Sequence, residues 1–483
     1  MTRRLLMLPV LALGLSACAP DLGPLPQPKA ESSLASQKSF AAPAADWPAQ
    51  DWWTAYHDPQ LNALIAEGLA GSPDIRVAEA RVKEADAQAR QSGAALYPHL
   101  TANGSVSENR QSLNQGFPKQ FQSFLPHGWH DQGQITGNMN YDLDLFGANR
   151  AQFAAATSDA AAAQVDLAAA RLTLSTAIAS AYANLEQLVA DRAAAEESLS
   201  ERQQSTELVR QRASQQLENE GEVSQARSRS AGAKADLDQI DGQIALARDQ
   251  LAALVGKGPD RGLDVALPGA AALRPFGVPA TLGVDLIGRR PDIVAARLRA
   301  EAASSRIKAA HAAYYPNINL NGDLGFQALG IANLISPASE IGQIGPAVSL
   351  PIFDGGRIEA GYRNARAQYD EAVANYDKTL TQALRDVADA LANQRELATE
   401  LADAKIALAE SENAYRIATL RYQGGLSRYL DVLTSEDTLV VQRRRVADLQ
   451  ARAFGQDVAL VHALGGGFAT SDNGAGGGAD AKN

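Results

Sequence analysis

The chain holds a single cysteine, Cys18, among its 483 residues. A lone cysteine excludes an intramolecular disulfide and any cysteine-based metal cluster. Basic residues are also in short supply, because 44 Lys and Arg face 55 Asp and Glu and leave a formal net charge of −11. An acidic chain lacks the basic surface that nucleic-acid binding requires, so we expect no nucleic-acid partner.

Long apolar runs are missing as well. Beyond the N-terminal segment, no stretch approaches the ~20 apolar residues that a membrane-spanning helix needs. If the protein crosses a membrane, it must therefore do so as β-strands. The sequence also offers no nucleophile–base pair, and Gly256–Gly262 contains Gly-Lys without the spacing of a phosphate-binding loop. We therefore expect no enzymatic activity, no cofactor and no metal site.

The N-terminus has the features of an export signal. Arg3 and Arg4 precede the short apolar segment Leu5–Leu15, as in a secretory signal peptide. The residues LSAC, ending at Cys18, are similar to the site where bacterial lipoproteins are cut and acylated. Acyl chains on Cys18 would anchor the mature chain to a membrane. By resemblance to other bacterial lipoproteins, Ala19 after it favours the outer membrane. The alternative is a plain signal peptide with an incidental cysteine.

Two halves of the chain repeat the same motifs in the same order. SPDIRVAEAR at Ser72–Arg81 resembles RPDIVAARLR at Arg290–Arg299, and YDLDLFGANR at Tyr141–Arg150 resembles VSLPIFDGGR at Val348–Arg357. A repeat this long is half a protein rather than a small solenoid unit. We predict a signal peptide at 1–17, a lipidated extended tether at 18–50, repeats at 51–283 and 284–464, and a disordered Gly-rich tail at 465–483.

Most of each repeat is predicted to be helical. From Gly147 to about Ala213 the chain contains no proline and no further glycine, and Arg357–Gln423 is interrupted only by Gly361. Helices of this length measure about 100 Å at 1.5 Å per residue, which indicates coiled-coil packing. Each is followed by a polar or Gly-rich break and a returning helix, so each repeat should contain a long helical hairpin.

Four segments alternate apolar and polar residues with the period of a β-strand. They are Leu100–Val106, Ile135–Leu145, Ile318–Phe326 and Gln343–Ile352. Such alternation is typical of transmembrane strands, although amphipathic hairpins covering a soluble core would alternate too. Four strands cannot close a barrel, and an open edge in lipid leaves unpaired backbone groups. Three chains would supply twelve strands, so we expect a homotrimer with a shared β-barrel.

These features together resemble one family. The duplicated halves, LSAC, SLPIFDGGR and RYQGGLSRYLDVL are similar to TolC-type outer-membrane efflux proteins, in particular the lipoprotein branch with OprM- and NodT-like channels. The resemblance implies a mainly α fold with a small β part. In it, a trimeric twelve-stranded transmembrane β-barrel continues into a periplasmic twelve-helix α-barrel. It also implies a passive exit duct served by a periplasmic adaptor protein and a proton-driven inner-membrane pump of the resistance-nodulation-division (RND) type.

The residues of interest lie at the predicted hairpin tips. Aligning the two repeats there places Glu222 opposite Asp431. In a trimer each would form a ring of three carboxylates, which favours cations at a constriction. The family has a gating aspartate at the position of Asp431, whereas its second acid is Thr434 here. The alternative is that both acids are solvated on an exposed turn.

Other tip residues follow from the resemblance. Tyr422 matches a family tyrosine that helps to hold the closed state. The partner arginine of the family aligns with Ser427, and Arg421 and Arg428 stand nearby. The exposed tip that we expect an adaptor to contact is formed by Gly424, Gly425 and Leu426. His127–Asp131 has metal-like spacing, but we expect it to be a surface loop between strands.

Two other functions remain open at this stage. The same duct could serve a type I protein secretion system, for which the lipoprotein motif is less typical. The chain could also be a periplasmic coiled-coil scaffold that never enters the bilayer, which the four alternating strands argue against.

Overall fold

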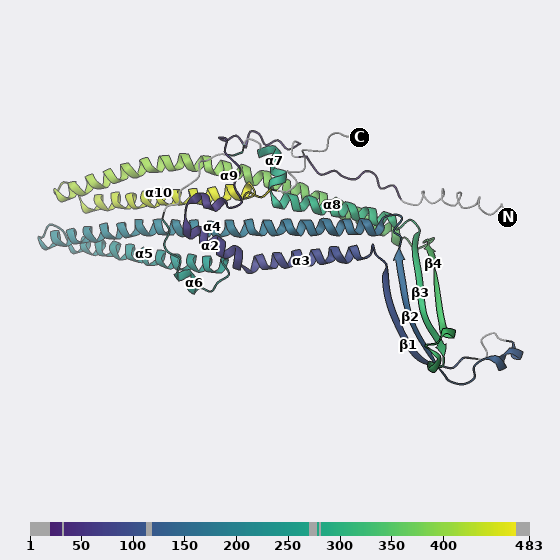
Figure 1. Ribbon diagram of the computed structural model, residues 1–483. Helices are drawn as coiled ribbons and strands as arrows, with labels where there is room; N and C mark the ends of the chain where they lie inside the picture. The colour runs from purple at the N-terminus through teal and green to yellow at the C-terminus, as the bar shows by residue number, and fades with distance from the viewer. Residues whose placement is uncertain (1–19, 31–32, 113–117, 270–277, 280–281, 470–483) are drawn as a thin grey trace. The chain divides into compact units, whose positions relative to one another are not determined.

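The computed structural model describes residues 20–30, 33–112, 118–269, 278–279 and 282–469 (Figure 1). Cys18, the predicted acylation site, lies outside these residues, as do the signal segment and the predicted tail from residue 470 onward. The chain forms two compact units. Unit 1 contains 83–162 and 297–375 with the N-terminal segment up to Gln27, and unit 2 contains 28–82, 163–296 and 376–483.

The predicted duplication is present in the order and length of the elements. Each half has a helix of 22 residues, two strands, a helix of 67 residues and a returning helix of 35 residues. In the first half these are α3 (Pro73–Ala94), β1 (His99–Asn109), β2 (His130–Asp142), α4 (Ala148–Ser214) and α5 (Glu220–Leu254). In the second they are α8 (Pro291–Ala312), β3 (Asn317–Leu329), β4 (Glu340–Ser349), α9 (Arg357–Gln423) and α10 (Tyr429–Ala463).

Shorter helices complete the described chain. The α-helices among them are α2 (Pro59–Gly71), α6 (Asp260–Leu263) and α7 (Leu282–Arg289), and the 3-10 helices are η3 (Trp52–Tyr56), η4 (Lys119–Phe124), η5 (Ile331–Asn333) and η6 (Pro337–Ser339). Gly361 does not interrupt α9, because a single glycine in a long helix costs only ~1 kcal/mol relative to alanine. Among the described residues, no helix is both long enough and apolar enough to span a membrane.

Unit 1 contains one antiparallel sheet in the order β1-β2-β3-β4 (Figure 1). All four predicted strands are present, and in the ladder Leu100 pairs with Met139, which pairs with Gly322. The apolar residues of the predicted alternation include exposed side chains, among them Leu100 and Ile344. The sheet therefore presents apolar side chains on a surface that nothing in the described part of this chain covers.

The predicted strand ends were partly wrong. The second strand begins at His130 rather than Ile135 and ends at Asp142 rather than Leu145. Its early end has a local cause, because Asp144 adopts a positive φ of 45° and its carboxylate accepts from the backbone N–H groups of Asn149 and Arg150. That carboxylate satisfies the first free N–H groups of α4, so the chain turns into the helix before Leu145.

The fourth strand also ends earlier than predicted. The fourth strand covers Glu340–Ser349 and does not reach Ile352, because Asp354 caps the start of α9 through the backbone N–H of Ile358.

His130 and Asp131 belong to β2, so only the first part of the metal-like motif His127–Asp131 lies in the loop. Among the described residues, no group of three His, Cys, Asp or Glu side chains is arranged to hold a metal.

The segment predicted to be an extended tether is held against α9. In unit 1, the Arg366 guanidinium donates to the carbonyls of Leu22 and Gly23, at 3.2 and 2.9 Å. In unit 2, Arg395 donates to the carbonyls of Ser39 and Ala41, both at 2.9 Å. Backbone carbonyls of an irregular segment thus find side-chain donors on a helix, which satisfies groups that no secondary structure pairs.

Candidate hairpin-tip gate

Both long hairpins turn at their tips with five residues, 215–219 between α4 and α5 and 424–428 between α9 and α10 (Figure 1). In each, the backbone N–H of a leucine reaches back to the last turn of the first helix: Leu217 donates to Arg212 and Leu426 to Arg421. Such bonds close a helix C-terminus when one residue adopts a left-handed conformation. Gln216 has a φ of 61° and Gly425 a φ of 71°.

The two predicted gate acids occupy equivalent positions in the helices that follow. Glu222 and Asp431 are each the third residue of α5 or α10, and each accepts a backbone N–H at the helix start, from Asn219 at 3.4 Å and from Arg428 at 3.2 Å. An acid at this position stabilises the positive end of the helix dipole. Both acids therefore stabilise the turn that precedes their helix. Glu222 is half-buried and Asp431 is exposed.

An apolar cluster joins the two tips within unit 2. The Tyr422 side chain is almost completely buried and its ring lies 5.5 Å from that of Tyr429. The buried members of the cluster are Val209, Val223, Ala226, Tyr422, Tyr429, Val432 and Leu433. These residues come from both hairpins, so separating the tips would expose apolar surface to water.

A cation that the sequence analysis did not identify connects the hairpins. The Arg212 guanidinium lies 4.6 Å from the centre of the Tyr422 ring and donates to the Tyr422 carbonyl at 3.3 Å. It also forms an ion pair with Glu218 at 3.3 Å. We call Arg212, Glu218 and Tyr422 the tip latch. The repeat alignment could have pointed to Arg212, because it aligns with Arg421. Only the tertiary contact with Tyr422 distinguishes the two arginines.

The carboxyl groups at the tip affect one another. The neighbouring Glu218 carboxyl, and then burial, raise the pKa of Glu222 above its ordinary value. Burial raises the pKa of Glu218, but Glu222, Tyr422 and Arg212 together outweigh it, so the pKa of Glu218 lies below its ordinary value. Burial and the Glu218 carboxylate raise the pKa of the Tyr422 hydroxyl. A proton on the pair therefore resides on Glu222, and Glu218 remains the anion that faces Arg212.

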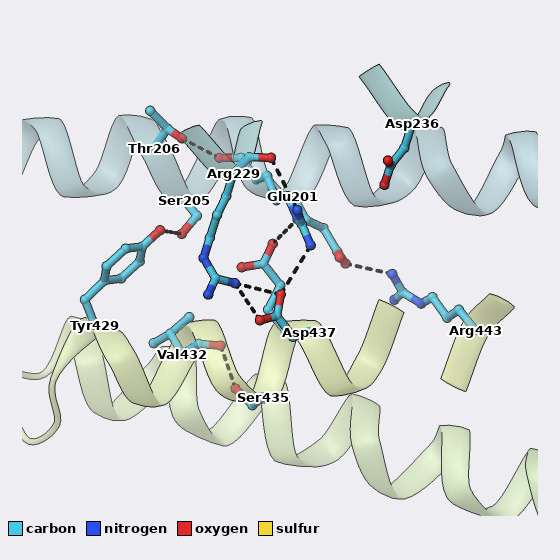
Figure 2. A network of polar contacts seen from close by, with 12 residues as sticks. Glu201, Ser205, Thr206, Arg229, Asp236, Tyr429, Val432, Ser435, Asp437 and Arg443 are labelled. Carbon is cyan, nitrogen blue, oxygen red and sulfur yellow. Dashed lines mark hydrogen bonds and ion pairs between the residues drawn. The ribbon is translucent and has the colours of Figure 1, made fainter. Parts of the chain in front are cut away.

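A layer of charged residues lies next to the apolar cluster along the helices (Figure 2). Arg229 of α5 donates to both carboxylate oxygens of Asp437 on α10, at 2.7 and 2.6 Å. Arg443 of α10 donates to Glu201 of α4 at 3.0 Å. These pairs join α10 to both helices of the first hairpin, which adds directional contacts to the non-directional apolar cluster.

The remaining predicted site residues are exposed at the tip of the second hairpin. Arg421, Arg428, Gly424 and Gly425 are exposed, and the Leu426 side chain is 73% exposed. The turn from 424 to 428 thus presents an apolar side chain to solvent, with two exposed arginines beside it. Their predicted roles, in an adaptor contact and in the closed state, remain predictions.

Comparisons with known proteins agree on one family. The model of the outer membrane efflux protein family matches residues 64–257 and 282–466. The fusaric acid resistance protein FusA of Burkholderia cepacia is 35% identical over 377 residues, covering 76% of this chain and 70% of FusA. The cation efflux system protein CusC of Escherichia coli K12 is 29% identical over 464 residues, covering 94% of this chain and 98% of CusC. The crystal structure of the outer membrane protein VceC of Vibrio cholerae has a TM-score of 0.83 at 43% identity, covering 87% of this chain and 100% of VceC.

These matches confirm the expected fold class. The chain is mainly helical with a small antiparallel sheet, is built from two repeats, and shares its fold with solved outer-membrane channels. Its relatives are efflux proteins, and the family consists of channels rather than enzymes. The chain therefore belongs to the outer membrane efflux protein family and is an outer-membrane channel protein, not an enzyme.

Proposed function

We propose that the protein is the exit duct of a tripartite efflux system and is gated at its hairpin tips. Three copies share a twelve-stranded barrel, which continues into a tube of twelve helices across the periplasm. The observation that supports this best is the tip latch, because Arg212 and Tyr422 join two hairpins of equal length at their ends. A contact there can hold a tube closed without affecting its walls elsewhere.

The proposed duct works passively and takes its energy from partners. An RND-type proton-driven pump in the inner membrane supplies the cargo, and a periplasmic adaptor joins pump and duct. The adaptor contacts the turn formed by Gly424, Gly425 and Leu426, where an exposed apolar side chain supports a protein contact. An adaptor opens the gate only if it binds the open state more tightly than the closed one.

The proposed cargo comprises drugs or toxic compounds. Relatives are named for fusaric acid resistance, cation efflux and multidrug resistance, which supports efflux over the type I protein secretion alternative. In a trimer, Asp431 and Glu222 would form acidic rings at the constriction, and such rings favour cations. We also propose that acyl chains, such as palmitate, on Cys18 anchor the chain in the outer membrane.

The test is a deletion strain of the source bacterium, exposed to a panel of antibiotics, fusaric acid and copper salts. We expect increased susceptibility to some of these compounds and restoration by the wild-type gene. Unchanged susceptibility together with loss of a secreted protein would instead favour type I secretion.

A fractionation experiment separates the duct from the scaffold alternative. The variant Cys18→Ser lacks the acylation site, and we expect it to resist extraction from membranes by high salt and alkali because the strands hold it in the bilayer. Its release by either treatment would favour the non-spanning scaffold.

A further inference from the structure

Glu436 is a buried acid that the proposed gate does not use. Its side chain on α10 is 1% exposed, and it forms an ion pair with the Arg202 guanidinium of α4 at 3.3 Å. Among the described residues, neither of its carboxylate oxygens accepts a hydrogen bond. A buried charge with so few partners is costly, because burial removes its hydration without replacing it.

The cations around Glu436 are engaged by other acids. Arg202 also contacts Asp437 at 3.3 Å, and Arg229 contacts the same Asp437 carboxylate at 2.6 Å. Arg443 pairs with Glu201 at 3.0 Å. The titratable and charged groups that act on Glu436 are Glu201 and Arg202 on α4, Arg229 on α5, Tyr415 on α9, and Tyr429 and Asp437 on α10. Arg443 on α10 in turn contacts Glu201 and, on α9, Glu412. Figure 2 shows Arg229 pointing at Asp437 and Arg443 pointing at Glu201.

We propose that Glu436 is a proton-operated switch. Its neutral form tightens the packing of the two hairpins, and its anion loosens it. When Glu436 takes up a proton, the buried charge disappears and Arg202 keeps its ion pair with Asp437. When it loses the proton, the packed arrangement must hold an anion that would be hydrated if the helices moved apart. Acid in the surrounding solution thus favours the packed state, independently of whether the protein conducts.

The electrostatics of Glu436 set the pH range of this effect. Burial raises the pKa of Glu436 to about 6, with Asp437 and Glu201 adding to the rise and Arg202 and Arg229 opposing it. Burial also raises the pKa of Tyr415 to about 12, so that phenol stays neutral throughout. A group whose pKa is raised in the packed state stabilises that state as the pH falls. If Glu436 has the pKa of an ordinary glutamate in the separated state, the equilibrium constant for packing rises ~8-fold between pH 7 and pH 5.

Hydrogen–deuterium exchange of the full-length protein in detergent tests this directly. Exchange of peptides covering 197–210 and 429–443 is measured from pH 5 to pH 8 and corrected for the intrinsic pH dependence of amide exchange. We expect protection in wild type to rise ~8-fold from pH 7 to pH 5. The variant Glu436→Gln mimics the neutral form, so it should be protected at pH 7 as strongly as wild type at pH 5.

Matched variants identify the source of the pH response. Glu412→Gln removes a half-exposed carboxylate that also contacts Arg443, and this variant should retain the wild-type response. If Glu436→Gln does not fold, Arg202→Gln gives a second test, because losing this cation should move the rise in protection to higher pH. The proposal would be overturned if the wild-type protein had no pH response. It would also be overturned if the pH response were the same in wild type and in Glu436→Gln, or the same in wild type and in Arg202→Gln.

Discussion

The two repeats match in their helices and differ in their loops. The long helices have 67 residues in both halves and the returning helices 35, whereas the strands are connected by 110–129 in one half and 330–339 in the other. A length mismatch of one helical turn would move a tip by about 5.4 Å and separate Arg212 from Tyr422. We infer that the contact between tips fixes the helix lengths, and that no such contact fixes the loops.

At the tips, equivalent positions of the repeats hold complementary side chains. The first half supplies the charged groups of the latch and the second half supplies its ring. The equivalent pairs are Arg212 and Arg421, Ala213 and Tyr422, Glu218 and Ser427, and Asn219 and Arg428. The two tips thus share a backbone but not the roles of their side chains, so a substitution in one half should have effects that its counterpart does not.

The largest expected difference concerns Tyr422 and its counterpart Ala213. The Tyr422 side chain is 1% exposed in the apolar cluster, so Tyr422→Ala should cost ~3–5 kcal/mol of local unfolding free energy at the tip. Ala213→Ser should cost less than ~0.5 kcal/mol. Hydrogen exchange of the tip peptides measures both, and equal protection in the two variants would contradict the assigned packing.

The two arginines should differ next. Arg212→Ala removes a cation–π contact, a hydrogen bond and an ion pair, with an expected cost of ~1–2 kcal/mol. Arg421→Ala removes an exposed side chain and should change the unfolding free energy by less than ~0.5 kcal/mol. The same exchange measurement compares them, and a larger effect for Arg421 would restore the role that the sequence suggested for it.

The helix caps give a smaller contrast. The Asn219 side chain accepts from Gly221 and Glu222, so Asn219→Ala should destabilise the start of α5 by ~1 kcal/mol. Arg428→Asn introduces such an acceptor at the start of α10 and should stabilise it by ~0.5–1 kcal/mol. Thermal melting of the purified protein and exchange at each helix start would reveal both. A loss of stability in Arg428→Asn would mean that the two turns are not equivalent.

The smallest expected effect is the acid sensitivity of the tip latch formed by Arg212, Glu218 and Tyr422. Because the pKa of Glu218 is lowered in the folded tip, its ion pair with Arg212 contributes above the ordinary glutamate pKa. That contribution is lost as the pH falls through the lowered value. In wild type, exchange of residues 209–219 should therefore accelerate under strong acid after intrinsic correction. Glu218→Gln should not show this change, and an identical acid response in this variant would exclude Glu218 as its source.

The sequence predicted the helices better than the contacts between them. Gly147, Gly356 and Gly424 stand at three of the four ends of the two glycine-poor stretches, and a polar run from Gln215 marks the fourth. The long helices could therefore be located within one residue. The ends of β2 and β4 could not, because Asp144 and Asp354 end the strands by capping the following helices. Those caps depend on side-chain geometry that alternation does not encode.

The candidate site was only partly predictable for the same reason. Repeat alignment located Glu222 and Asp431, because they occupy matching positions in similar turns. Arg212 and Glu218 could not be chosen over their counterparts, since their partner Tyr422 belongs to the other hairpin. Burial of Glu436 likewise depends on helices of both hairpins meeting. Contacts between distant segments decide these roles, and local sequence patterns do not reveal them.

We propose that the contact between the two hairpins holds the duct closed. Single-channel recording in planar lipid bilayers tests it most directly, with wild type, Arg212→Ala and Arg421→Ala compared under the same conditions. We predict small or rare current steps for wild type and Arg421→Ala, and larger or more frequent steps for Arg212→Ala. Absence of current steps in all three, or the same conductance in all three, would contradict the claim.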